Sequence, residues 1–202
     1  DVINRGFSGY NSRWGVLIVD QVVVTEKPDI VFVFFGANDA VDLRVGQHVA
    51  LPEYSSNIRS IISTLQQIKN CIQRLPKTRL VLITAPPVWE PKLEEMNISK
   101  GKLPTLDRTN DRTLTYVEAC KSLGKEMGVP VVDAWSAMGG ATSSRADFLS
   151  DGLHLNSLGN TRLFEEARRV VLSRYPELNP EALPMHMLEW AQMIERDRAA
   201  LN

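Results

Sequence analysis

Short runs of apolar residues alternate along this chain with longer segments in which apolar residues recur every three or four positions. The short runs have the length of strands but lack the strict alternation of a half-exposed strand, which is typical of strands covered on both faces of a parallel sheet. They are residues 29–35, 79–84 and 129–133. The longer segments have the periodicity of amphipathic helices. They are residues 13–26, 52–73, 107–127, 157–174 and 180–201. Because strands and helices alternate without a hairpin signal, the pattern predicts an α/β fold, a doubly wound parallel sheet flanked by helices in three layers.

Polar and proline residues mark where several of these elements begin and end. Ser12 suits the N-cap of the first helix, and Pro28 ends that helix. Either Asn156 or Ser157 caps the helix that follows the last strand. Residues 88–104 are irregular, polar and flanked by prolines, so we expect a long loop there. Long loops in compact domains often cover a functional site.

The first residues have the pattern of the end of a strand. The chain begins at Asp1 rather than at methionine and runs directly into the apolar pair Val2 and Ile3, followed by Asn4. We therefore expect an N-terminally truncated chain in which the first strand of the sheet is missing. The whole chain predicts a single domain, within which residues 180–202 form a C-terminal helical extension.

Composition and charge narrow the classes of partner. The chain has 202 residues, of which 44% are hydrophobic, enough for one domain that buries about 70% of its unfolded surface. The formal net charge is −1 and the cationic residues are spread through the chain, which argues against a nucleic-acid partner. The longest apolar run, near residues 30–37, is far shorter than the roughly 20 residues of a membrane span. We expect a cytoplasmic protein with no membrane span.

Two cysteines, Cys71 and Cys120, stand in helical patterns without a CxxC pair or a nearby histidine. Cysteines in that setting indicate a reducing compartment and predict no metal site.

Candidate chemistry gathers where the predicted strands end, because ligands of open parallel sheets bind beyond the carboxyl ends of the strands. Three polar segments fall there by this pattern. They are residues 4–10, 36–39 and 151–155.

Asp151 and His154 make the sharpest candidate pair, three positions apart. A carboxylate that holds the Nδ1 proton of a histidine leaves Nε2 free to act as a base and stabilises the imidazolium once it forms. The alternative is structural: Asp151 caps a turn and His154 is an ordinary, partly buried histidine.

Gly9 and Asn38 are candidate donors to an oxyanion. The Asn38 amide offers N–H groups, and the backbone N–H of Gly9 can approach a substrate closely because no Cβ intervenes. Each such donor is worth about 3–4 kcal/mol of barrier. The alternative is that these residues, with their neighbouring glycines, only make tight turns.

Three ordered blocks of sequence carry a resemblance to a known family. They are Asn4-Arg5-Gly6-Phe7-Ser8-Gly9-Tyr10-Asn11-Ser12-Arg13-Trp14, Phe34-Phe35-Gly36-Ala37-Asn38-Asp39 and Leu149-Ser150-Asp151-Gly152-Leu153-His154-Leu155. In this order and at these separations they resemble the GDSL (SGNH) hydrolases, in particular the branch of isoamyl-acetate-hydrolysing esterases. Lesser matches lie at Gln47-His48-Val49, Glu53-Tyr54 and Arg108-Thr109-Asn110, and the resemblance covers residues 1 to about 175.

The resemblance implies a domain of the SGNH type, related to the flavodoxin-like three-layer folds, and a role for each candidate residue. Gly9 and Asn38 correspond to oxyanion donors, His154 to the general base and Asp151 to the carboxylate that orients it. The implied substrate is a small-molecule ester of a short acyl chain or a small alcohol, with no cofactor.

One part of the family pattern has no counterpart in the chain. The Gly-Asp-Ser block that carries the nucleophile corresponds to sequence upstream of residue 1, so we expect the chain alone to be inactive. Ser8 and Ser150 are poor substitutes, since a nucleophile must point at its base within hydrogen-bond reach. Three functions remain open: an esterase whose serine lies upstream, a non-catalytic isoform that binds esters or carboxylates or pairs with another subunit, and a carbohydrate acetyl-esterase. A homo-oligomer is also left open.

Overall fold

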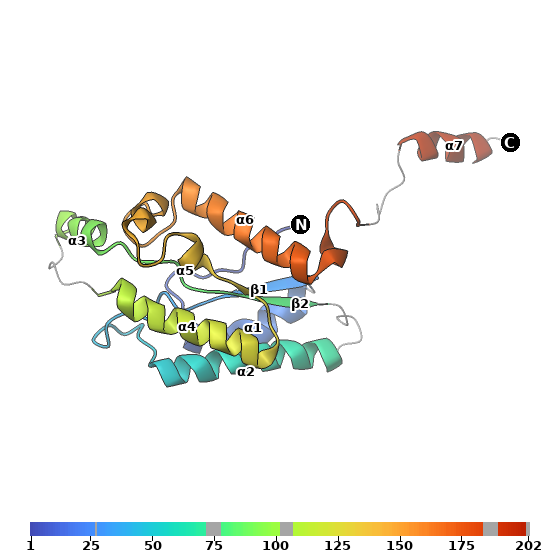
Figure 1. Ribbon diagram of the computed structural model, residues 1–202. Coiled ribbons are helices and arrows are strands. Elements are labelled where there is room, and N and C mark those ends of the chain that lie inside the picture. The colour runs from blue at the N-terminus through green and yellow to red at the C-terminus, as the bar shows by residue number, and fades with distance from the viewer. Residues whose placement is uncertain (27, 72–77, 102–106, 184–189, 201–202) are drawn as a thin grey trace.

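Three parallel strands in the order β1-β2-β3 form the centre of the fold (Figure 1). The computed structural model describes residues 1–26, 28–71, 78–101, 107–183 and 190–200. β1 (Ile30–Phe34) pairs with β2 (Arg79–Ile83) over its full length, with Phe32 opposite Val81. β3 (Val131–Val132) adds a short third strand on the other side of β2. The predicted parallel α/β sheet is therefore confirmed.

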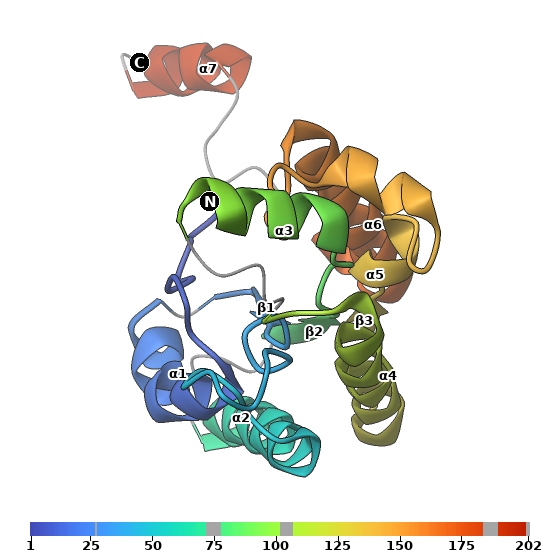
Figure 2. The same ribbon diagram turned by 90° about the vertical axis from the view of Figure 1, so that its left-hand side faces the viewer.

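Helices cover the two faces of this sheet as separate layers (Figure 2). One face carries α1 (Ser12–Glu26), α2 (Leu51–Cys71) and α4 (Asn110–Met127). The opposite face carries α5 (Ala134–Ala137) and α6 (Ser157–Arg174). Alternate residues of β2 serve the two cores, since Leu82 packs with α2 and α4 whereas Val81 packs with α5 and α6.

Local sequence explains the element boundaries that were predicted correctly. Asn156 caps α6, because its side chain accepts the Gly159 N–H at 2.9 Å. Gly128 ends α4 in the left-handed conformation at φ 67°, which glycine adopts without a steric penalty. The helix predicted at residues 13–26 is α1, and it begins at Ser12.

The prediction of one long loop over residues 88–104 is wrong for most of that segment. Helix α3 (Glu90–Ser99) occupies it, preceded by Trp89 at the N-cap. Pro91 lies in the first turn of α3, where no intrahelical N–H is required, so the proline that suggested a loop is compatible with a helix start. Residues 102–104 lie outside the described residues.

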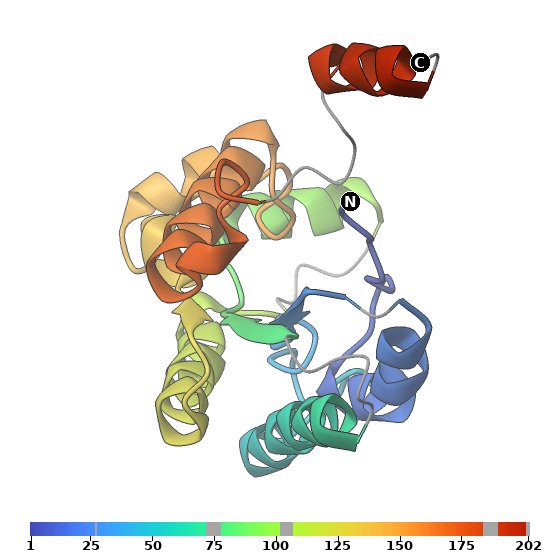
Figure 3. The same cartoon turned by 90° about the vertical axis from the view of Figure 1, so that its right-hand side faces the viewer.

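Further differences concern short elements and the C-terminus. The 3-10 helices η1 (Ser143–Phe148) and η2 (Pro176–Leu178) and the one-turn α5 are too short to give a periodic signal. The helix predicted over residues 180–201 is shorter than expected, since α7 spans Trp190–Ala200. Figures 1 and 3 show α7 standing apart from the layers, at the C-terminal end of the chain. Residues 184–189 of that predicted helix lie outside the described residues.

The expected strand at the start of the chain is absent, because residues 1–6 form no strand and the Val2 side chain is fully exposed. A strand forms by pairing, and no described strand lies beside this segment. The prediction that residues 29–35 are covered on both faces is also wrong. Phe32 and Phe34 are 42% and 41% exposed, because α5 and α6 pack against the same face at β2 and β3 rather than at β1.

Among the described helices, none is both long and apolar enough to cross a membrane.

Candidate active site

The segment between η1 and α6 presents His154 on a closed turn. An isolated bridge between Leu149 and Leu155 and the bond from the Ser150 N–H to the His154 carbonyl, at 2.8 Å, close this turn. The His154 side chain is 74% exposed, and its Nδ1 lies 2.7 Å from Oδ2 of Asp151. The two residues that the sequence paired are therefore in direct contact.

Asp151 holds both the turn and the ring. Its Oδ1 accepts the backbone N–H groups of Leu153 at 3.0 Å and His154 at 2.8 Å. Burial acts to raise the pKa of Asp151, but the hydrogen bonds from His154 and Leu153 outweigh it and leave the pKa below the usual value. An ionised carboxylate only accepts hydrogen bonds, so Nδ1 carries the proton in the neutral ring and Nε2 has a free lone pair. No described residue hydrogen-bonds to that Nε2.

Gly152 ties this turn to the start of α3. Its carbonyl accepts the Trp89 N–H at 2.8 Å, and its φ is +87°. A Cβ at this position would lie 2.5 Å from the Trp89 carbonyl oxygen and 2.6 Å from the Leu93 nitrogen. Only glycine fits, because both the left-handed backbone and the close approach of α3 exclude a side chain.

The structure brings the two candidate oxyanion segments together. The Asn38 amide donates from Nδ2 to the Tyr10 carbonyl at 2.8 Å, which places the turn after β1 against residues 9–10. Gly9 has φ +79°, and its carbonyl accepts from Gln47 Nε2 at 2.7 Å. Within the described part of the chain the Gly9 N–H has no hydrogen-bond partner, so it remains available to a ligand.

A small hollow of about 150 Å³ lies at this junction. Its lining residues are Tyr10, Phe34, Phe35, Gly36, Ala37 and Asn38. Asp151 and His154 do not line this hollow. The two pairs of candidate residues are connected through the start of α4, which contacts Asn38 and Val88, and through Trp89, which contacts Gly152.

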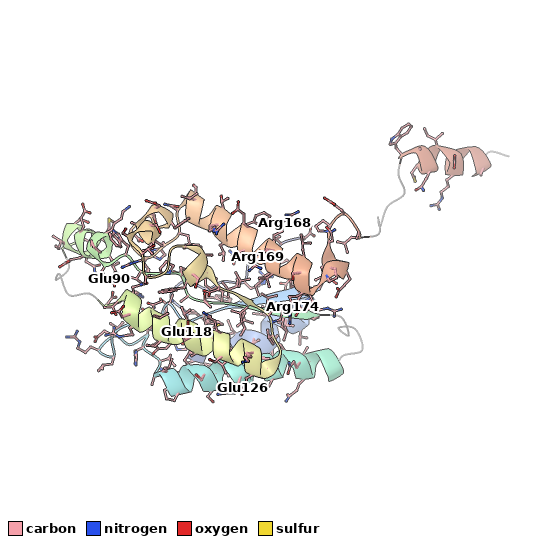
Figure 4. All side chains as sticks on the ribbon, in the orientation of Figure 1. Glu90, Glu118, Glu126, Arg168, Arg169 and Arg174 are labelled. Carbon is pink, nitrogen blue, oxygen red and sulfur yellow. The ribbon has the colours of Figure 1, made fainter. Side chains whose placement is uncertain are left out.

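Asn110 and Glu90 join the start of α4 to the loop that follows β2 and to the start of α3. Asn110, at the start of α4, accepts the Val88 N–H on Oδ1 at 3.0 Å, and its own N–H donates to Glu90 Oε1 at 2.7 Å. Figure 4 shows Glu90 where α3 begins, beside the first turn of α4. Trp89 lies between Val88 and Glu90 in sequence, and its N–H binds the Gly152 carbonyl in the His154 turn, so the base is anchored to the same end of the sheet as Asn38.

Asp39 stabilises the turn that carries the candidate oxyanion donor Asn38. It is fully buried, and its carboxylate accepts the Ser12 N–H at 2.9 Å and the Gly36 N–H at 3.1 Å. Burial raises the pKa of Asp39 above its usual value despite those two hydrogen bonds. The carboxylate thereby joins the first residue of α1 to the turn that carries Asn38.

Sequence reasoning assigned no role to Asp39, Asn110 or Arg108, although Arg108 and Asn110 belong to a recognised lesser match. The Arg108 guanidinium donates to Asn38 Oδ1 at 3.0 Å. These residues could have been found from their place in the sequence blocks that resemble the family. The hydrophobic periodicity could not have found them, because it carries no information about polar side chains that bond across the fold.

Neither serine considered as a substitute nucleophile hydrogen-bonds to the ring of His154 in the described structure. Ser150 Oγ donates to the His154 carbonyl at 3.0 Å instead, and Ser8 is exposed. Among the described residues, no group of three or more histidine, cysteine, aspartate or glutamate side chains could hold a metal ion. Burial raises the pKa of the Cys120 thiol to about 12, which makes it unreactive at neutral pH.

Comparisons with known proteins find relatives along most of the chain. The sequence model of the GDSL-like Lipase/Acylhydrolase family matches residues 1–162. The isoamyl acetate-hydrolyzing esterase 1 homolog of Rattus norvegicus is 41% identical over 170 residues, which is 81% of this chain and 66% of the relative. The human homolog is 34% identical over 201 residues, covering 96% of this chain and 76% of the relative. The chain thus spans about two thirds of the rat protein that it matches.

Solved structures show the same fold. A lipase/acylhydrolase from Enterococcus faecalis superposes with a TM-score of 0.63 at 25% identity, covering 82% of this chain and 72% of that one. A catalytic mutant of an acetylxylan esterase from Geobacillus stearothermophilus superposes with a TM-score of 0.61 at 23% identity, covering 84% and 71%. Since the family model matches most of the chain and the esterase homologues match it at 34–41% identity, this protein belongs to the GDSL-like lipase/acylhydrolase family.

Proposed function

We propose that the chain supplies the base and the oxyanion donors of a carboxylic ester hydrolase that acts on short-chain esters such as acetates. The observation that carries this proposal is the contact of 2.7 Å between His154 Nδ1 and Asp151 Oδ2, which leaves Nε2 exposed and unpaired among the described residues. A histidine in that state is the general base of the Ser-His-Asp mechanism.

Each residue has a step in the reaction. Nε2 of His154 removes the proton from a serine hydroxyl as the oxygen attacks the ester carbonyl, and Asp151 stabilises the imidazolium. The carbonyl oxygen, now negative, accepts hydrogen bonds from the Gly9 N–H and the free Asn38 amide N–H. The imidazolium then gives its proton to the departing alcohol oxygen. Water repeats the sequence on the acyl-serine, which releases the acid and restores the serine.

The serine in this proposal comes from a strand that adds to the free edge of β1. β1 is hydrogen-bonded to a strand only on the β2 side in the described sheet, and an unpaired edge accepts a further strand. The exposed Phe32 and Phe34 side chains leave an apolar face that such a segment would cover. Without that serine, turnover falls by about a millionfold in a well-measured serine hydrolase. We therefore expect the chain alone to be inactive.

The test supplies the proposed nucleophile. A Gly-Asp-Ser strand segment taken from a homologous esterase is fused upstream of Asp1, and hydrolysis of p-nitrophenyl acetate is measured. We expect hydrolysis that is abolished by His154→Ala and by alanine at the fused serine. Equal hydrolysis by the unfused chain would contradict the position of the nucleophile. A fusion that unfolds cooperatively but shows no hydrolysis would contradict the function.

Two further readouts separate the remaining functions. Acetylated xylo-oligosaccharides in the same assay distinguish a carbohydrate acetyl-esterase from an esterase of simple alcohols. Calorimetry of the unfused chain with acetate tests whether it binds carboxylates without catalysis, for which the unpaired Gly9 N–H and the exposed His154 ring are the candidate contacts.

A further inference from the structure

Arg108 approaches the oxyanion side of the site from a distant part of the chain. It lies just before α4, 70 residues from Asn38 in sequence, and its Nη2 donates to Asn38 Oδ1 at 3.0 Å. Nη1 donates to Asp107 Oδ2 at 2.7 Å. The Arg108 side chain is only 11% exposed. Its guanidinium is therefore held in one place rather than moving in solvent.

The backbone around Arg108 is tied to the segment that follows Asn38. The Asp42 N–H donates to the Asp107 carbonyl at 2.6 Å, and Arg112 forms an ion pair with Asp42 at 3.5 Å. These contacts keep the arginine in register with the turn after β1. Its contact with Asn38 is thus part of a built junction between two loops.

We propose that Arg108 is a positioning residue, which sets the orientation of the Asn38 amide so that an N–H is presented to the ester oxygen. This inference rests on the proposed oxyanion role of Asn38. The two partners of the amide fix its orientation. Arginine is only a donor, and the Tyr10 carbonyl is only an acceptor. Asn38 therefore binds Arg108 through Oδ1 and Tyr10 through Nδ2.

The opposite orientation is strongly disfavoured. A rotation of the amide by half a turn would place its NH₂ against the Arg108 donor and its oxygen against the Tyr10 carbonyl. Both hydrogen bonds would be replaced by repulsive contacts, and the group near the hollow would be an acceptor. A developing oxyanion would then be repelled. The bond from a charged donor is worth about 1.5–3 kcal/mol, enough to populate one orientation almost exclusively.

The positive charge also strengthens the remaining donor. A guanidinium on the carbonyl side of an amide draws electron density toward that oxygen, which makes the amide N–H a better donor. Arg108 Nε is buried and has no partner among the described residues. An unsatisfied buried donor costs stability, so this arginine is held at some cost to the fold, as is common for residues at functional sites.

The first experiment observes the amide directly in the chain without a fusion. Side-chain NH₂ signals are recorded on protein labelled with ¹⁵N-asparagine. The pair of proton signals that disappears in Asn38→Asp belongs to the Asn38 amide. Nuclear Overhauser contacts of this pair to Tyr10 protons are expected, and contacts to the Arg108 guanidinium instead would overturn the proposal. Because this measurement needs no change at Arg108, it stands even if a variant does not fold.

The second experiment removes the donor. In Arg108→Met we expect the Asn38 NH₂ protons to exchange with solvent about tenfold faster, as the loss of one charged hydrogen bond predicts, whereas Arg108→Lys retains part of the protection. Arg168→Met is the matched control, because Arg168 is exposed on α6, where Figure 4 labels it, and Asn38 follows β1. An unchanged exchange rate of the Asn38 NH₂ protons in a folded Arg108→Met variant would overturn the proposal.

The fused esterase supplies the catalytic readout. Loss of one oriented oxyanion donor lowers kcat by about 100-fold to 1000-fold. For Arg108→Met we expect a large part of that loss with little change in KM, and partial recovery in Arg108→Lys. An inactive fusion with the expected NMR result would overturn the proposed function alone. An active fusion whose kcat is insensitive to Arg108→Met would overturn the positioning role alone.

Discussion

Asp151 binds His154 twice, through the ring and through the backbone of the same residue. Oδ2 lies 2.7 Å from Nδ1, and Oδ1 accepts the His154 N–H at 2.8 Å. The carboxylate that orients the base therefore also shapes the turn that carries it. Any change to Asp151 should alter the tautomer and the position of the ring together.

Replacing Asp151 by asparagine tests the tautomer. If the asparagine places its NH₂ against the ring, Nδ1 must become the acceptor and the proton moves to Nε2, where it blocks the base. We expect ¹⁵N shifts of the His154 ring to reverse between wild type and Asp151→Asn. In the fused esterase kcat should fall by about 10⁴-fold, as in the corresponding change of a well-studied serine protease. Asp147→Asn is the control, because Asp147 is exposed four residues earlier. Equal ring spectra in wild type and Asp151→Asn would contradict the assignment.

The pH dependence of Asp151 follows from its lowered pKa. Its unfolded value is near 3.8 and its folded value is lower, so the folded state favours the ionised form. The resulting contribution to the free energy of unfolding is fully present above the unfolded pKa and is lost as pH falls through the folded pKa. We expect the Asp151 carboxyl ¹³C shift to titrate below pH 3.8, whereas an Asp151 midpoint above that value would refute the contact as described. The stability difference between wild type and Asp151→Asn should shrink over the same acid range.

Gly152→Ala tests how tightly α3 holds the base turn. The substitution places a Cβ 2.5 Å from the Trp89 carbonyl oxygen in a backbone with φ +87°. Gly128→Ala is a matched control, because Gly128 also has a positive φ, +67°, but nothing lies within 4 Å of its added Cβ. We expect the control to lose about 1–2 kcal/mol of unfolding free energy from backbone strain. Gly152→Ala should lose more, by at least about 1 kcal/mol, because the clash involves backbone atoms. Equal losses in urea denaturation would show that the contact with Trp89 is not tight.

The elements with strong periodicity could be predicted from sequence, and the reason is physical. β2 is apolar from Leu80 to Ile83 because it is covered on both faces there, and α2 carries Ile58, Ile61, Ile62 and Leu65 along its buried stripe. α3 could not be predicted, since its buried stripe is nearly absent and only Leu93 is buried. Its position depends on tertiary contacts, such as the bond between Trp89 and Gly152.

The candidate site likewise has one part that could be predicted from the sequence and one part that could not. Asp151 and His154 interact within one turn, so their spacing made the contact a candidate, while the structural alternative stayed open until the family resemblance was considered. The bond between Arg108 and Asn38 joins residues 70 positions apart and depends on how two loops meet. Nothing in local spacing predicts such a pair. The apolar run of β1 was also misleading, because exposure of Phe32 and Phe34 depends on which neighbouring elements pack over that strand.

Asn110→Ala tests how the start of α4 is held against the loop after β2 and against α5. The Asn110 side chain is buried, accepts the N–H groups of Val88 and of the Trp135 indole, and donates to the Gly140 carbonyl at 3.1 Å. Alanine removes the partner of two buried groups, at about 1–3 kcal/mol each, and of the partly buried Trp135 indole N–H, and these losses are partly relieved where water enters. We expect a loss of about 3–5 kcal/mol in urea denaturation. Asn160→Ala, at an exposed position on α6, should change stability by no more than about 0.5 kcal/mol. A loss below about 1 kcal/mol for Asn110→Ala would mean that the start of α4 is held to the loop after β2 and to α5 by other contacts.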